Sequence, residues 1–289
     1  MRYHSSVIID VHTHVFPPEV RDQRDEYLQR DATFRELYSN PKARIATADE
    51  LLASMDAAGI DRSVACGFAW SEAELCRRHN DYLLEASATP GGRLIPFCTV
   101  QPSDDGARDE LKRCAARGAR GLGELRPGHQ GYRLIDTGEA DLLAWGADAY
   151  DLVLLFHASE PVGRVYPGKG GLPLEELYRF IADFPGVTVI AAHWGGGLPF
   201  YALMPEVREE LARTYFDTAA TSFLYHPDVY ARGIELVGAE RILFGSDFPL
   251  ISQEQALREV ADAAGAIDDE ARRLILGENA RRLLRLPDG

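Results

Sequence analysis

The feature that most constrains the fold is a regular alternation of two kinds of segment along the chain. Short runs of β-branched and apolar residues predict strands at 7–12, 63–68, 94–100, 119–125, 152–157, 187–193, 214–219 and 241–247. Segments with helical spacing lie between them, at 48–58, 72–88, 105–117, 139–150, 174–184, 203–212, 227–237 and 253–264. A strand followed by a helix, repeated eight times, predicts an α/β fold in which helices cover a parallel sheet.

Eight such units predict closure into a (β/α)8 TIM barrel, and 289 residues is an ordinary length for such a barrel as a single domain, here residues 1–289. The alternative is an open doubly wound sheet, but no Gly-x-Gly-x-x-Gly motif follows the first strand to support a dinucleotide-binding version. The one long insertion, residues 15–46, is charged, aromatic and interrupted by proline. It is predicted to be a lid-like loop with one or two short helices over the strand ends; a solvated insertion is the alternative.

Polar side chains stand at the carboxyl ends of six predicted strands. In chain order these residues are Asp10, His12, His14, Glu124, His157, His193, Asp217 and Asp247. From Glu124 onward, each lies about one strand–helix unit after the previous one. Because the strands of a barrel run in parallel, these side chains are expected to gather at one end, around the barrel axis.

The pair His12 and His14 predicts a metal site. Side chains two apart in a strand point to the same side, so both imidazoles should face the barrel interior. A single histidine in an apolar strand is more often a hydrogen-bonded core residue. Four histidines and two carboxylates at one end are better explained by a shared divalent cation, since burying them without a partner would be costly. Imidazole with carboxylate suits zinc, manganese, iron or nickel.

These motifs resemble those of a known family. Asp-x-His-x-His on the first strand, single histidines on the fifth and sixth and an aspartate on the eighth resemble the amidohydrolase superfamily. The segments "HTHVFPPE", "GSDFP" and "LGENARRLL" resemble its amidohydrolase-related (amidohydrolase 2) branch. That branch includes aminocarboxymuconate-semialdehyde decarboxylase, related decarboxylases, and lactone and amide hydrolases. The resemblance covers essentially the whole chain and is not specific for one substrate.

The resemblance implies a role for each strand-end residue. Four residues would be metal ligands: His12, His14, His157 and Asp247. Asp247 would also be the general base, and His193 would be either a ligand of a second metal or a free acid–base residue beside one metal. Asp10 would hydrogen-bond near the site without binding the ion. The ion expected first is zinc, as one or two ions.

Glu124 bears on the number of metals. In "RGLGELRP" it sits at the end of the fourth strand, where the resemblance implies a bridging carboxylate in binuclear members of the superfamily and usually none in decarboxylases. This favours two ions and hydrolysis, in which metal-activated water attacks the C–O or C–N bond of a small, carboxylate-bearing lactone, ester or amide. The alternative is a mononuclear metal-dependent decarboxylase or hydratase of an unsaturated carboxylic acid, with His193 transferring the proton.

Two weaker alternatives come from other classes of protein. One is a barrel that holds its metal without catalysis. The other is a glycosidase that pairs Asp217 with Glu124, which would leave the four histidines unexplained. Asp217 is instead expected to support the site or cap a loop.

Three further residues are candidates for substrate binding: Arg126, Arg164 and Trp194. Arg126 lies two residues after Glu124, so both should face the same way, and a guanidinium there suits a carboxylate. Arg164 lies in the loop after the fifth strand, and Trp194 follows His193, where its ring could form an apolar wall. Ordinary surface charge and aromatic packing are the alternatives.

The composition of the chain limits the classes of molecule that it is expected to bind. A net charge of −14 disfavours nucleic acid and anionic membranes as partners, which leaves a small-molecule substrate. The chain shows neither a membrane-spanning apolar run nor a signal-peptide pattern, so a cytoplasmic protein with reduced cysteines is expected. A homodimer is left open. The remaining histidines are expected at the surface; they are His4, His79, His129 and His226. His129 and His226 lie on loops that could reach substrate.

Overall fold

The computed structural model describes residues 7–89, 91–263 and 267–287, and the eight predicted strands form one sheet in chain order. Every neighbouring pair is parallel. The strands are β1 (Ile9–His14), β2 (Arg62–Cys66), β3 (Leu94–Cys98), β4 (Gly121–Leu125), β5 (Val153–Phe156), β6 (Val189–Ala191), β7 (Thr214–Asp217) and β8 (Ile242–Leu243). Two predicted features lie outside the described residues: His4, and residue 264, where the helix predicted at 253–264 was expected to end. The domain extent 1–289 stays a prediction.

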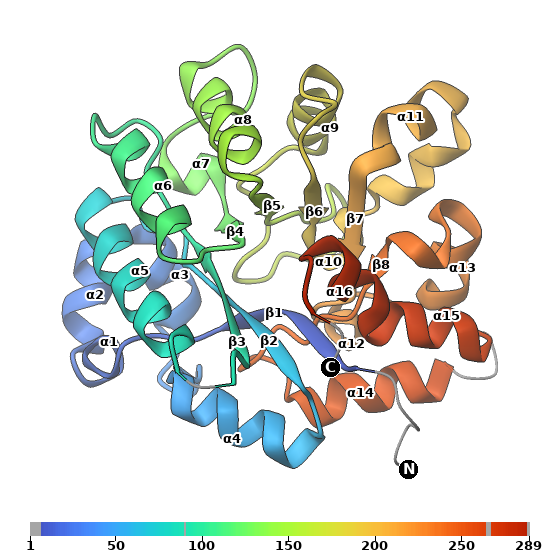
Figure 1. Ribbon diagram of the computed structural model, residues 1–289, viewed down its shortest axis with the longest axis horizontal. Helices are drawn as coiled ribbons and strands as arrows, with labels where there is room; N and C mark the ends of the chain where they lie inside the picture. Colours follow the sequence, from blue (N-terminus) through green and yellow to red (C-terminus); the bar gives the residue numbers. More distant parts are fainter. Residues whose placement is uncertain (1–6, 90, 264–266, 288–289) are drawn as a thin grey trace.

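The sheet closes on itself between its last and first strands. The Val11 amide donates to the Phe244 carbonyl at 2.8 Å, and the Asp247 amide donates to the His12 carbonyl at 2.9 Å. A parallel bridge joins Thr13 to Phe248. The prediction of a (β/α)8 barrel is therefore confirmed, with the strands at the centre and the helices outside them (Figure 1).

The helices that follow the strands match the predicted segments closely. They are α4 (Ala48–Ala58), α5 (Ala73–Ser87), α6 (Ala107–Ala116), α8 (Gly138–Tyr150), α9 (Leu174–Asp183), α11 (Pro205–Glu210), α13 (Val229–Val237) and α14 (Gln253–Asp262). Local sequence explains their ends. In α4, the Thr47 hydroxyl and the Glu50 carboxylate form a capping box at the start, and Gly59 at φ +73° ends the helix.

Shorter helices complete the chain. Within the loops after the strands lie α7 (Pro127–Gln130), α10 (Ala192–Gly195) and α12 (Thr221–Leu224), with 3₁₀ segments η1 (Leu198–Leu203), η2 (Leu211–Arg213) and η3 (Ala239–Arg241). The amphipathic end of the chain forms α15 (Asp269–Arg273), a π-helical turn (Leu274–Glu278) and α16 (Asn279–Leu283). The predicted helix at 203–212 is divided, because Pro205 cannot continue the preceding turn and instead begins α11.

The apolar residues of the strands form two separate cores. One packs the outer face of the barrel against the helices, and the other fills the barrel interior, with Ile9 and Val11 from β1 among its members. A register shift between Asp10 and Thr13 interrupts the regular pairing of β1 with β2. Such a bulge re-aims the side chains that follow it. His12 and His14 can therefore face the interior although Val11 does so too.

The insertion differs from its prediction in the number of helices and also departs from the solvated alternative. It contains three helices instead of one or two: α1 (Pro18–Asp22), α2 (Arg24–Arg30) and α3 (Ala32–Tyr38). It is also not simply solvated, because its aromatic side chains are buried against the end of β2. The resulting cluster includes Phe16, Tyr27, Phe34, Tyr38, Phe68 and Trp70. This aromatic burial, which a reading of charge and proline alone underestimates, anchors the insertion to the barrel.

Candidate metal centre

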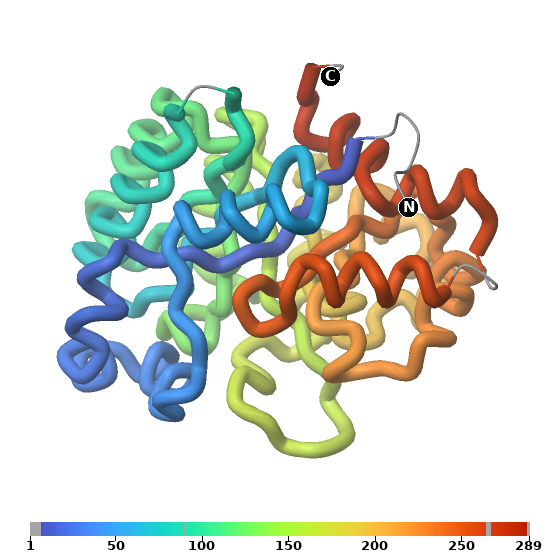
Figure 2. The backbone as a smooth tube through the Cα atoms, turned by 90° about the horizontal axis from the view of Figure 1, so that it is seen from below, coloured from blue at the N-terminus to red at the C-terminus, as the bar shows by residue number. Residues whose placement is uncertain are grey.

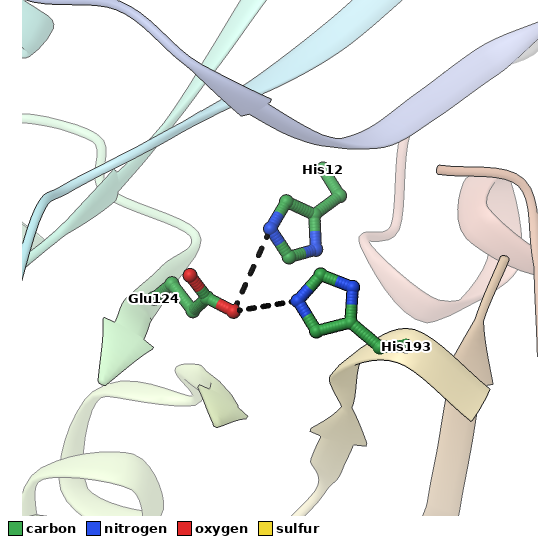
Figure 3. A group of neighbouring side chains, drawn as sticks. All are labelled: His12, Glu124 and His193. Carbon is green, nitrogen blue, oxygen red and sulfur yellow. Dashed lines mark ion pairs between the residues drawn. The ribbon is translucent and has the colours of Figure 1, made fainter. Parts of the chain in front are cut away.

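Three of the predicted ligands meet at the carboxyl end of the barrel. His12 comes from β1, Glu124 from β4, and His193 from the turn after β6 (Figure 3). Glu124 Oε1 lies 3.3 Å from His193 Nε2 and 3.7 Å from His12 Nε2. His193 is reached by a tight left-handed turn, since φ is +55° at His193 and +56° at Trp194. This turn ends the strand at Ala191, two residues before the predicted end.

A second group of donors shares His12. The Nε2 atoms of His12 and His14 are 3.1 Å apart, and Asp247 Oδ1 lies 3.4 Å from His14 Nε2 and 3.8 Å from His12 Nε2. The donors thus form two groups of three, His12 with Glu124 and His193, and His12 with His14 and Asp247. Within each group, every residue offers one possible ligand atom, and these three atoms lie within 4.8 Å of one another.

His157 completes the set from the end of β5. Its Nδ1 lies 2.9 Å from Glu124 Oε1, and its Nε2 lies 2.8 Å from the Gly168 carbonyl oxygen. The His157 and His193 rings have centroids 5.1 Å apart. The structure thus brings all six predicted ligands together, although their roles stay predictions.

The arrangement fits a divalent cation. Two neutral imidazole nitrogens facing each other at 3.1 Å can share at most one hydrogen, and otherwise direct lone pairs at each other. A cation between the imidazoles and the carboxylates would use these lone pairs, and this mixture of nitrogen and oxygen donors suits zinc or manganese.

Asp217, from β7, orients two of these histidines. Its Oδ2 lies 2.8 Å from His12 Nδ1, and its Oδ1 accepts a hydrogen bond from the His193 backbone amide at 2.8 Å. A carboxylate on the far nitrogen of a ligand histidine fixes the ring and directs the other nitrogen at the metal. Asp217 therefore supports the site, as the sequence suggested.

Asp10 lies on the other side of β1. Its carboxylate accepts hydrogen bonds from the Ser246 hydroxyl at 2.6 Å, the Gln253 amide at 2.8 Å and the His12 backbone N–H at 3.1 Å. It links β1 to the segment after β8 and to α14. These hydrogen bonds agree with the expected hydrogen-bonding role near the site.

Mutual attraction between the histidines and the carboxylates favours the charged form of both kinds of side chain in this group. Burial works to lower the pKa of His12, but Asp217 and Glu124 outweigh burial and raise that pKa to about 10. Burial is likewise outweighed at His193, whose pKa rises to about 9 beside Glu124 and Asp247. The neighbouring histidines overcome burial at Asp247 and lower its pKa to about 2. In the metal-free protein, protons on these histidines therefore compensate the carboxylates.

The three predicted substrate-binding residues lie in different surroundings. The Arg126 side chain is buried and bonded to Glu36 at 3.2 Å. Arg164 is exposed and donates to the Phe223 carbonyl at 2.6 Å. Trp194 is 2% exposed and donates its indole N–H to Thr221 at 2.9 Å, so its ring lies in the core and not at the site. A substrate contact by any of them stays a prediction.

His79 is not the surface residue that its charged helix suggested. It is buried, its Nε2 lies 2.8 Å from the Val15 carbonyl, and its Nδ1 accepts the Trp70 indole N–H at 3.1 Å. Burial lowers the pKa of His79 to about 4, so it is neutral. It joins the insertion to α5. His226 is exposed as expected, whereas His129 is half-buried and lies 3.0 Å from Glu36.

Two residues of the insertion near the site were not identified from the sequence. Glu36 pairs with Arg126 and His129. Tyr38 is buried, and burial raises the pKa of its hydroxyl. The nearby negative charges of Asp247 and Glu124 raise that pKa further. Their segment, "RELY", resembles any amphipathic helical turn. Only the folding of α3 against the barrel reveals them.

Comparisons with known proteins agree with the fold. The sequence profile of the family Amidohydro_2, an amidohydrolase family, matches residues 9–286, which confirms the resemblance. The 6-methylsalicylic acid decarboxylase of Penicillium expansum is 32% identical over 48% of this chain, and the match spans about half (48%) of that relative's length. The gamma-resorcylate decarboxylase of Rhizobium sp. (strain MTP-10005) is 26% identical over 74% of this chain and 76% of its own.

A solved structure shows the same architecture. The 5-carboxyvanillate decarboxylase of Novosphingobium aromaticivorans DSM 12444, complexed with manganese and 4-hydroxy-3-methoxy-5-nitrobenzoic acid, superposes with a TM-score of 0.80. Its identity is 18%, and the match covers 98% of this chain and 97% of that chain. At this identity the likeness shows the shared fold. No helix in the described ranges is long and apolar enough to cross a membrane.

The expectation that hydrolysis of a C–O or C–N bond is the main reaction is wrong. The named relatives are decarboxylases, the reaction that the sequence left as the alternative. The error lay in taking Glu124 as a sign of two metals and hence of hydrolysis. A carboxylate at this strand end does not select the reaction, because the same donors can surround one ion or two.

Proposed function

Because the chain belongs to the amidohydrolase family Amidohydro_2, we propose that it is a metal-dependent decarboxylase of an aromatic carboxylic acid with a hydroxyl group next to the carboxyl group. The observation that carries this proposal is the chemistry shared by its relatives. 6-Methylsalicylic acid and gamma-resorcylate are both hydroxybenzoates, and the second relative aligns with about three quarters of the chain (74%).

The proposed ligands are the donors that converge on the barrel axis. They are His12, His14, His157 and Asp247, with Glu124 beside them. A bound divalent cation, manganese or zinc, would hold the carboxylate and the adjacent hydroxyl of the substrate and draw electron density from the ring. Manganese is favoured by the complex of the structural neighbour.

His193 is the proposed proton donor. Decarboxylation replaces the carboxyl group on a ring carbon by hydrogen, so that carbon must receive a proton as the C–C bond breaks and CO₂ leaves. His193 Nδ1 lies 3.2 Å from the Ala219 carbonyl, so Nδ1 carries hydrogen and Nε2 faces the centre. A protonated His193 can therefore deliver the Nε2 proton to the ring carbon and regain one from water after release of CO₂.

The test is CO₂ release by the manganese-loaded protein. 2,6-Dihydroxybenzoate, 6-methylsalicylate and 5-carboxyvanillate are offered in turn, with benzoate as a control that lacks the hydroxyl group. Turnover of at least one hydroxybenzoate, lost with chelator and absent with benzoate, supports the proposal. A metal-loaded protein that releases no CO₂ from any of the three contradicts it.

A further inference from the structure

One carboxylate ties the insertion to the loop after β5. Glu36 in α3 accepts a hydrogen bond from the Gly168 amide through Oε1 at 2.9 Å. Its Oε2 lies 3.2 Å from Arg126 Nη1 and 3.0 Å from His129 Nε2. In Figure 2 the blue insertion and the yellow-green loop lie at the same end of the molecule. Glu36 thus connects two segments that are far apart in the sequence.

Gly168 connects this carboxylate to His157. Its amide donates to Glu36, and its carbonyl oxygen lies 2.8 Å from His157 Nε2. Gly168 has φ +100°, and a Cβ there would lie 3.2 Å from a Leu37 methyl carbon, so glycine is needed for this turn. One residue therefore accepts a hydrogen bond from the candidate ligand on one side and donates one to the insertion on the other.

The carbonyl decides which nitrogen of His157 faces the centre. A carbonyl oxygen only accepts hydrogen bonds, so Nε2 carries the hydrogen. In the neutral ring, Nδ1 then holds the lone pair, and it lies 2.9 Å from Glu124 on the side of the other donors. Nδ1 is thus the atom of His157 available to a metal.

Arg126 strengthens the same loop. Its Nε donates to the Gly170 carbonyl at 3.1 Å, and its Nη2 donates to the Lys169 carbonyl at 3.4 Å. With Nη1 on Glu36, the buried guanidinium fixes the two residues that follow Gly168. The loop is held by charge and hydrogen bonds from both α3 and the end of β4.

We propose that Glu36 is a positioning residue of the metal centre: together with Arg126 it holds the Gly168 carbonyl where that carbonyl orients His157 with Nδ1 toward the ion. This inference rests on the metal site in the proposed function and adds a specific role for the insertion. Backbone carbonyls and carboxylates that orient a ligand histidine typically affect metal affinity about 10–100-fold. Here the orienting carbonyl is itself set by a side chain from outside the barrel.

The experiment measures Mn²⁺ affinity on the metal-free full-length protein by calorimetric titration or chelator competition. Glu36→Ala removes all three contacts of the carboxylate, to Gly168, Arg126 and His129, and should weaken Mn²⁺ binding about 10-fold or more. Glu36→Gln keeps an oxygen for the Gly168 amide but loses the charge toward Arg126. It should recover most of the affinity while remaining weaker than wild type, with a loss smaller than the roughly 10–100-fold typical of a removed orienting partner. Glu26→Ala, on the exposed face of α2, is the matched control and should bind as wild type.

Two further readouts separate orientation of His157 from general loosening. The absorption spectrum of the Co²⁺-loaded protein should change in Glu36→Ala, because the ligand geometry changes, and should return toward wild type in Glu36→Gln. In a His157→Ala background, adding Glu36→Ala should cause no further loss of Mn²⁺ affinity, since the two residues act through one contact.

The inference is overturned if Glu36→Ala binds Mn²⁺ like wild type with an unchanged Co²⁺ spectrum, or if its effect adds in full to that of His157→Ala. If Glu36→Ala does not fold, the Mn²⁺ affinity of Glu36→Gln decides: an affinity equal to that of wild type overturns the inference. Failure of the proposed function looks different. Wild-type protein that binds Mn²⁺ but releases no CO₂ contradicts decarboxylation and leaves the affinity test of Glu36 valid.

Discussion

At the scale of single residues, the site depends on buried carboxylates that contact histidines. Asp217 uses both oxygens, one toward His12 Nδ1 at 2.8 Å and one accepting the His193 amide at 2.8 Å. It is fully buried, so neither contact can be replaced by bulk water. The orientation of the His12 ring and the position of the His193 backbone therefore both depend on one side chain.

Asp217→Asn should weaken Mn²⁺ binding about 10–100-fold. The carboxylate meets three nitrogens, His12 Nδ1 through one oxygen and the backbone amides of His193 and Ala219 through the other. The asparagine has one oxygen, so its NH₂ group must replace an acceptor on one of these two sides. Chelator competition checks this. Asp228→Asn, an exposed aspartate, is the control and should bind as wild type; equal affinities for both variants would show that Asp217 does not orient the ligands.

His193→Asn should lower kcat for decarboxylation by about 10²–10⁴-fold, the usual contribution of a positioned proton donor. Mn²⁺ affinity should change little if His193 transfers protons and is not a ligand. Single-turnover CO₂ release and metal titration on the same preparation give both numbers. A large loss of affinity would instead assign His193 to the metal.

At the scale of elements, the insertion behaves as part of the barrel. Phe34 in α3 is fully buried, and its ring lies 5.4 Å from that of Trp70 and 6.0 Å from that of Phe68, both in the segment after β2. Aromatic packing of this kind holds α3 in place, and Glu36 is on the same helix. The stability of the insertion and the geometry of the site are therefore linked.

Phe34→Ala should lower the free energy of unfolding by about 3–5 kcal/mol, because it leaves a cavity in a closely packed aromatic cluster. Urea denaturation of the metal-free protein measures this. Leu250→Ala is the control: its side chain is 58% exposed, and the loss should stay within about 0.5 kcal/mol. Similar small losses for both would mean that the insertion contributes little to the fold.

At the scale of the whole molecule, the unmetallated site makes stability depend on pH. The folded-state pKa values of His12 and His193 are raised to about 10 and about 9, above an ordinary value of 6.5. Groups with raised pKa values stabilise the folded state fully below the ordinary value, and this contribution is lost as pH rises through the folded-state values.

The thermal midpoint of the chelator-treated protein should therefore fall as pH rises from about 6.5 toward 10. Mn²⁺ affinity should rise over the same range, because ligands must lose protons to bind the ion. The His193→Asn variant should show a smaller fall between about pH 6.5 and 9, because only the contribution of His12 remains there. A flat midpoint in wild type, or an affinity that falls with pH, would contradict this coupling.

Much of the fold could be predicted because its signals are local. Strand and helix periods and the polar residues at strand ends are properties of short segments, and parallel closure then brings the ends together. His12, Glu124, His157, His193 and Asp247 meet for that reason. The choice between hydrolysis and decarboxylation could not be predicted, since the same donors serve both reactions.

The eight-unit barrel and the group of candidate ligands are already encoded in residue order, because both follow from it once the strands are parallel. The contacts between segments distant in the chain become visible only after folding. Folding turned Trp194 into the core through the left-handed turn at His193, buried His79 against the insertion, and joined Glu36 to Arg126 and the Gly168 loop. No periodicity encodes these pairings, since each depends on how two separately formed elements pack and which buried polar groups must then find partners.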